Sequence, residues 1–168
     1  MEIDRKMIQE GDSYQALKTK TSIAEILETA SSFEYTAFIF YSSLQDKIDP
    51  SLRPFVQELA EEEKNHFELF QGLSRHPHAL AHYADLVKTP PGNHRFTDYV
   101  RPPPPTEFPD NKAIFLYAMG REQTALEQYS ALAQATEGPI QDLFYYLAHE
   151  EMEHVKKLQK RYEELTSR

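Results

Sequence analysis

The chain has 168 residues, with 27 acidic and 18 basic side chains and a formal net charge of -9. That length suits one domain, and the acidic balance argues against nucleic acid or an anionic membrane as partner, because both bind basic surfaces. The absence of cysteine excludes disulfides, iron–sulfur clusters and thiolate zinc sites within the chain. The N-terminus lacks the apolar core of a signal peptide, and no apolar run approaches the ~20 residues of a membrane span. We expect a cytoplasmic protein.

Helical periodicity begins after a polar arm at residues 1–20. Ser22 and Glu25 have the spacing of a capping box, and apolar residues then recur every 3.6 positions from Ile23 to Leu44. This pattern predicts a helix that stops near Asp49–Pro50. A second helix is predicted over residues 51–75, with an apolar stripe of the same period.

Residues 76–110 hold eight of the eleven prolines and predict a long strap with at most short helical pieces. Asp110 is a plausible N-cap for a third helix that runs to about Thr136. A turn at residues 137–139 then leads into a fourth helix from Ile140 almost to the C-terminus. Two helices, a strap and two helices predict an all-α four-helix bundle with one long crossover, the ferritin-like topology, over residues 21–168.

The two halves of the sequence repeat. A shift of 88 positions, as from Glu34 to Glu122, aligns one glutamate in the first helix of each half and a Glu-x-x-His motif in the second. An antiparallel hairpin folded at each predicted turn places its lone glutamate level with its motif, and residues at i and i+3 share a helix face. The six aligned residues are Glu34, Glu63, His66, Glu122, Glu151 and His154.

Carboxylates on a core-facing stripe need compensation. Glu34 lies between Phe33 and Ala37, where a lone charge would cost several kcal/mol unless it is paired or bound to a cation. Four glutamates need roughly two divalent cations, and carboxylate with imidazole suits iron or manganese, with zinc possible. The sequence therefore predicts a two-metal centre, and di-iron bundles use the same set of ligands.

These motifs resemble the rubrerythrin and bacterioferritin branch of the ferritin-like superfamily, over about residues 22–165. The resemblance implies two iron ions bridged by Glu63 and Glu151. It implies that Glu34 with His66 completes one ion, and Glu122 with His154 the other. Tyr41 resembles the tyrosine beside the ligands of rubrerythrins, which implies a catalytic role as hydrogen-bond donor or radical quencher.

The sequence departs from rubrerythrins at two points. Ala125 stands where they carry an extra glutamate, so their redox-linked metal movement is not expected here. The chain also has no cysteine to hold a rubredoxin iron, so electrons must come from an external donor.

We expect a rubrerythrin-like di-iron oxidoreductase of the peroxidase or ferroxidase type that reduces H2O2 or O2 under oxidative stress. Two alternatives stay open, namely a non-catalytic protein for iron binding, storage or delivery, and a metal-free structural bundle. The resemblance implies a homodimer, and Phe38, Phe40 and Tyr41 on several sides of the first helix suggest more apolar surface than one core can cover.

Other polar residues are assigned more modest roles. We expect Glu61, Glu62, Glu150 and Glu153 to form a solvated acidic face, although Glu62 and Glu150 are also placed to hydrogen-bond a ligand. Tyr41 and Tyr129 are as consistent with plain core aromatics as with functional ones. The histidines after the second helix lack carboxylates at ligand spacing, and we expect them to be exposed; they are His76, His78 and His82.

Overall fold

The computed structural model describes residues 23–76, 103 and 105–167. The described residues form four long helices, two short 3-10 helices and no strand, which confirms the predicted all-α bundle. The predicted arm, Ser22 and most of the strap lie outside the described residues. The helices are α2 (Ile23–Ser43), η1 (Pro50–Leu52), α3 (Arg53–Ser74), η3 (Pro105–Glu107), α5 (Asn111–Gln134) and α6 (Gly138–Thr166).

The helix ends follow local chemistry. The carboxylate of Asp110 accepts a hydrogen bond from the amide of Ala113 at 2.9 Å, which confirms it as the N-cap of α5. Gly138 has a φ of 67° where α5 turns into α6, a conformation that favours glycine. The first helix ends at Ser43, about six residues before the predicted stop, because the amides of Leu44 and Gln45 bond carbonyls three residues back, at 3.2 and 3.4 Å, and tighten the chain into a turn.

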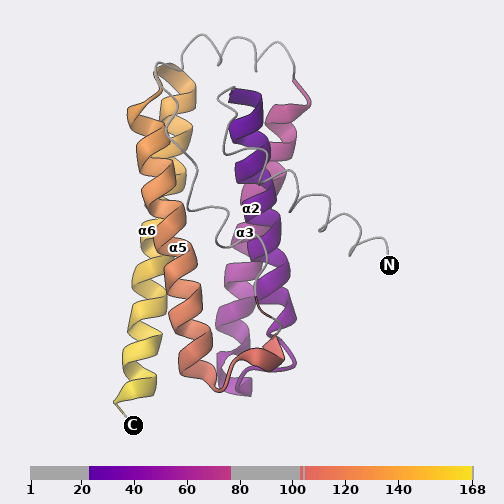
Figure 1. Cartoon of the computed structure of the whole chain (residues 1–168), viewed down its shortest axis with the longest axis vertical. Helices are drawn as coiled ribbons and strands as arrows, with labels where there is room; N and C mark the ends of the chain where they lie inside the picture. Colours follow the sequence, from indigo (N-terminus) through magenta and orange to yellow (C-terminus); the bar gives the residue numbers. More distant parts are fainter. Residues whose placement is uncertain (1–22, 77–102, 104, 168) are drawn as a thin grey trace.

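The helices pack as two antiparallel hairpins, α2 with α3 and α5 with α6, which lie side by side along the long axis (Figure 1). The core consists of two apolar clusters, and each draws residues from all four helices. One contains Phe33, Phe70 and Tyr129, and the other contains Phe40 and Phe115. Along every helix the predicted ligands fall between the two clusters, so the bundle encloses its polar residues at mid-height.

Two sequence-based expectations concern the surface of the protein, namely membrane-spanning segments and the apolar residues of the first helix. None of the helices in the described part of the chain is long and apolar enough to cross a membrane. Phe40 and Tyr41 are 1% and 0% exposed inside the chain's own core. Phe38, the third residue of that argument, is only partly buried and so keeps some surface for a partner, and the homodimer stays a prediction.

Candidate metal centre

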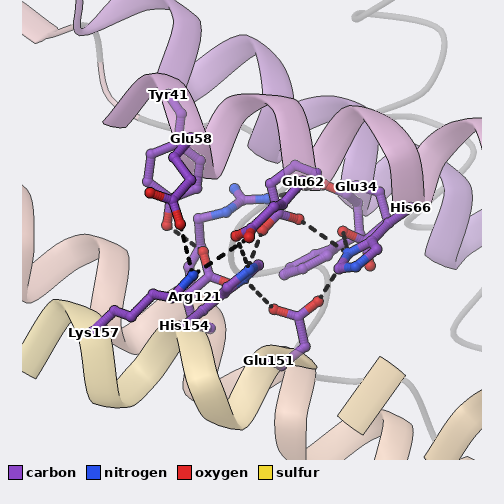
Figure 2. A network of polar contacts seen from close by, with 12 residues as sticks. Glu34, Tyr41, Glu58, Glu62, His66, Arg121, Glu151, His154 and Lys157 are labelled. Carbon is purple, nitrogen blue, oxygen red and sulfur yellow. Dashed lines mark hydrogen bonds and ion pairs between the residues drawn. The ribbon is translucent and has the colours of Figure 1, made fainter. Parts of the chain in front are cut away.

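The structure brings all six predicted ligands together at the middle of the bundle. Glu34 comes from α2, Glu63 and His66 from α3, Glu122 from α5, and Glu151 and His154 from α6. Each of them is at most 4% exposed. Figure 2 shows the labelled members converging between the helices.

The six residues form two overlapping groups, each with ligand atoms that lie within 4.8 Å of one another. Each group has four buried members, and Glu63 and Glu151 belong to both. The first group adds Glu34 and His66, and the second adds Glu122 and His154. These two groups contain the same residues as the two ligand sets that the resemblance to rubrerythrins implied.

The shared glutamates each face both histidines. Glu63 places Oε1 3.0 Å from His154 Nδ1 and Oε2 3.7 Å from His66 Nδ1. Glu151 places Oε2 3.2 Å from His154 Nδ1 and Oε1 3.2 Å from His66 Nδ1. A carboxylate that directs one oxygen toward each group is arranged to bridge two cations. Glu34 and Glu122 each belong to one group and are not arranged in this way.

Several buried ligand atoms make no well-aligned hydrogen bond, although some of them lie 3.0–3.7 Å from the nitrogen or oxygen of another predicted ligand. These atoms are Glu34 Oε2, Glu63 Oε1 and Oε2, His66 Nδ1 and Glu151 Oε1. Buried polar atoms in folded proteins are nearly always satisfied, so such a concentration calls for a ligand. Carboxylate oxygens and imidazole nitrogens suit iron, manganese or zinc, and the residues present therefore fit a pair of such ions.

Burial and mutual repulsion shift the titration of the glutamates. Burial, followed by the nearby charge of Glu63, raises the pKa of Glu34 to about 8. Burial and the charge of Glu122 raise the pKa of Glu151 to about 7. Burial also opposes ionisation of Glu122, but hydrogen bonding with His154 outweighs it and lowers the pKa of Glu122 to about 2. Without cations the centre therefore keeps protons that a metal would displace.

The pKa values of both histidines are raised as well, which favours the charged form of each ring. Burial disfavours the imidazolium, yet the close approach of the Glu151, Glu34 and Glu63 carboxylates outweighs it and raises the pKa of His66 far above its usual value. Burial likewise opposes the charge on His154, and the charge of Glu151 leads the contributions that raise its pKa. Both rings are protonated while the carboxylates lack another cation.

Residues 25–162 match the family model described as Rubrerythrin. The chain belongs to the rubrerythrin family. Comparison with curated proteins and with solved structures gave no significant match. The family assignment agrees with the resemblance found in the motifs, and the matched span contains every predicted ligand of this rubrerythrin-family centre.

Two tyrosines of the rubrerythrin-family bundle form hydrogen bonds from one half of the chain to the other. Tyr41 on α2 donates its hydroxyl hydrogen bond to Glu122 on α5, and Tyr129 on α5 donates to Glu34 on α2. Both tyrosines are 0% exposed. Both rings belong to the apolar clusters while both hydroxyls contact predicted ligands, and the catalytic role of Tyr41 stays a prediction.

Of the acidic residues near the ligands, Glu62 contacts the centre directly. Its Oε2 lies 2.7 Å from His154 Nε2, while its Oε1 lies 3.4 Å from the ammonium of Lys157. The alternative that Glu62 hydrogen-bonds a ligand is therefore the correct one. Glu61 and His76 are exposed as expected, whereas His78 and His82 lie outside the described residues.

Arg121 is a residue that the sequence reasoning missed. It is 0% exposed, its Nη2 donates to the carbonyl of Phe33 at 2.9 Å, and its guanidinium carbon lies 4.5 Å from the centroid of that ring. The available signal was its position beside Glu122 on the core stripe of α5, three residues after Ala118 and four before Ala125. The buried cation adds positive charge next to a cluster of carboxylates.

Proposed function

We propose that this chain is a di-iron oxidoreductase that reduces hydrogen peroxide or dioxygen. The observation that carries the proposal is the pair of buried groups with Glu63 and Glu151 common to both. Membership of the rubrerythrin family supports iron over other cations. With both positions filled, two Fe(II) ions would supply two electrons, and one H2O2 with two protons would become two waters while the ions become Fe(III).

The ligands would hold and neutralise the ions. Glu63 and Glu151 would bridge them, Glu34 with His66 would hold one, and Glu122 with His154 would hold the other. Because Glu34 carries a proton near neutral pH, cation binding would release that proton from its carboxyl group. Each histidine would bind through Nδ1, the nitrogen that faces the carboxylates.

The surrounding residues would orient the ligands and limit access. Tyr41 fixes the carboxylate of Glu122, and Tyr129 fixes that of Glu34, each through a hydrogen bond from the other half of the bundle. The two apolar clusters above and below the centre exclude bulk water. Ala37 and Ala125, both buried, each follow a predicted ligand by one helical turn, and their small side chains would crowd an oxidant less than larger ones.

The electrons must be replaced from outside the chain. A sequence with no cysteine cannot hold a rubredoxin iron, and no Gly-rich strand-to-helix fingerprint for a flavin or nicotinamide is present in it. We therefore include an external electron donor in the proposal. Without it the protein would complete one oxidation and stop.

Rapid mixing tests this function. The full chain loaded with two Fe(II) per chain is mixed with one equivalent of H2O2 or O2, and Fe(III) absorbance is followed. We expect one fast burst that persists, and repeated turnover once a chemical reductant is added. Glu63→Ala should remove the burst, whereas Glu61→Ala, which alters an exposed glutamate on the same helix, should keep it.

The alternatives give other outcomes. Iron binding without a burst for either oxidant would favour a protein for iron storage or delivery. Failure of the protein, purified without chelator, to retain any metal would favour the structural bundle. Sustained peroxide reduction far beyond one equivalent, with no added reductant, would refute the proposed source of electrons.

A further inference from the structure

The two halves of the centre differ just outside the ligands. His154 directs Nδ1 toward three carboxylates and Nε2 toward Glu62, at 2.7 Å. Lys157 holds the other oxygen of Glu62 at 3.4 Å and also reaches Glu58 at 2.9 Å (Figure 2). The His154 ring is thus held at Nε2 by Glu62, and Glu62 is itself held by Lys157.

The other half lacks this anchor. The 88-position repeat places Glu150 where Glu62 would be, but it replaces Lys157 by Leu69 and Glu58 by Tyr146. Leu69 and Tyr146 are 38% and 53% exposed. The side-chain carboxylate of Glu150 makes no hydrogen bond or ion pair with the residues that the structure describes. Within the described part of the chain, the repeated glutamate therefore has a cationic partner at Glu62 and none at Glu150.

A carboxylate on the outer nitrogen of a ligating histidine fixes its tautomer and ring orientation and increases its basicity. We propose that the Lys157-anchored Glu62 makes the two metal positions unequal, so that the position at His154 binds a divalent ion more tightly and fills first. The position at His66 fills second and exchanges its ion more readily. This inference rests on the metal centre of the proposed function, and it assigns Glu62 and Lys157 as positioning residues.

Stepwise metal titration tests the inference without reference to activity. Metal-free full-length protein competes with a chromophoric chelator for Zn(II), a redox-inactive probe, at pH 7. The wild-type chain should show two binding steps of different affinity. Glu62→Gln should weaken the tighter step by about 10- to 100-fold, the usual effect of losing such an outer partner. Lys157→Leu, which installs the residue of the other half, should act in the same direction by a smaller factor.

Two matched variants separate positioning from general damage. Glu150→Gln changes the equivalent residue of the other half and should leave both steps within about twofold of wild type. The double variant Leu69→Lys with Tyr146→Glu rebuilds the anchor in the other half at two exposed sites. It should strengthen the weaker step by several-fold and bring the two affinities closer together. A purely structural role for Glu62 would not predict this gain.

The outcomes are distinct from those of the proposed function. Two equal steps in the wild-type chain, or equal losses in Glu62→Gln and Glu150→Gln, would overturn the inference even if the protein reduces peroxide. If Glu62→Gln fails to fold by circular dichroism, the double variant decides alone, and an unchanged weaker step overturns the inference. Binding of no Zn(II) by the wild-type chain would instead refute the metal centre itself.

Discussion

Arg121 and Phe33 occupy equivalent positions in the two halves of the sequence, 88 residues apart, and they contact each other. The guanidinium lies over the Phe33 ring and donates to its backbone carbonyl. Two equivalent residues can meet only on the axis that relates the halves, so this contact marks the pseudo-twofold axis on the α2 and α5 side of the centre. The buried positive charge therefore stands between the two halves.

We expect Arg121→Met to lower the free energy of unfolding by about 2–4 kcal/mol, because it removes a charged hydrogen bond and a desolvated cation–π contact. Urea denaturation at pH 7 measures the change. Phe33→Leu keeps the charge and the backbone acceptor, and should cost less. A change below about 1 kcal/mol in Arg121→Met would show that the guanidinium does not hold α2 and α5 together.

Loss of a bridging carboxylate should affect both metal positions. We expect Glu63→Ala and Glu151→Ala each to reduce bound metal from about two ions to fewer than one per chain, because each glutamate contributes to both groups. Glu34→Ala should remove mainly one ion, since it belongs to one group. Elemental analysis of purified protein measures the content, with Glu61→Ala as the control. Full loading of both bridging variants would contradict the arrangement.

Much of this architecture follows from the sequence. The periods of apolar residues and the proline-rich stretch predicted the four helices, and the repeat with its register predicted the six converging residues. The end of α2 was misplaced because the chain tightens after Ser43, where the amides of Leu44 and Gln45 bond three residues back, and such backbone bonds leave no mark on the apolar pattern. The periodicity of apolar side chains predicts which face of a helix is buried, but it predicts the ends of the helix less accurately.

Contacts between the halves were beyond sequence reasoning. Tyr41 lies on the same helix face as Glu34, yet its hydroxyl reaches Glu122 on α5 instead. Glu62 and Glu150 are identical in the repeat, but the cation that contacts Glu62, Lys157, lies on a facing helix. Such pairings depend on how helices lie against one another, which spacing within one helix does not fix.

The metal-free protein should lose stability as pH rises from about 5 to 8. The pKa of Glu34 is about 8 in the folded chain, above its ordinary 4.5. In that window the unfolded chain has already released the proton that the folded chain retains, so the free energy of unfolding falls with pH. The raised pKa of His66 acts in the same direction above pH 6.5.

Thermal melts at pH 6, 7 and 8 with and without Mn(II) measure this effect. Because the cation displaces the retained protons, we expect the stabilisation by Mn(II) to increase with pH. Glu34→Gln does not titrate and should give the metal-free protein a shallower slope. A metal-free melting temperature that rises between pH 6 and 8 would contradict the assignment of buried, protonated carboxyl groups.

The two tyrosine hydrogen bonds should differ in strength near neutral pH. Tyr41 donates to Glu122, whose pKa of about 2 keeps it ionised, whereas Tyr129 donates to Glu34, whose pKa of about 8 keeps it neutral. Hydrogen bonds to charged groups contribute about 1.5–3 kcal/mol, and those to neutral groups about 0.5–1.5 kcal/mol. At pH 7 the metal-free Tyr41→Phe variant should therefore lose more stability than Tyr129→Phe.

Urea denaturation of the two variants at pH 7 and pH 9 measures the difference. Above pH 8 the Glu34 carboxyl ionises, so the bond from Tyr129 becomes charge-assisted and the two losses should converge. Tyr145→Phe, at a residue that is 50% exposed, controls for the removal of a hydroxyl and should change stability little. A larger loss for Tyr129→Phe at pH 7, or a gap that widens at pH 9, would mean that the two glutamates do not hold their protons as the burial of the centre requires.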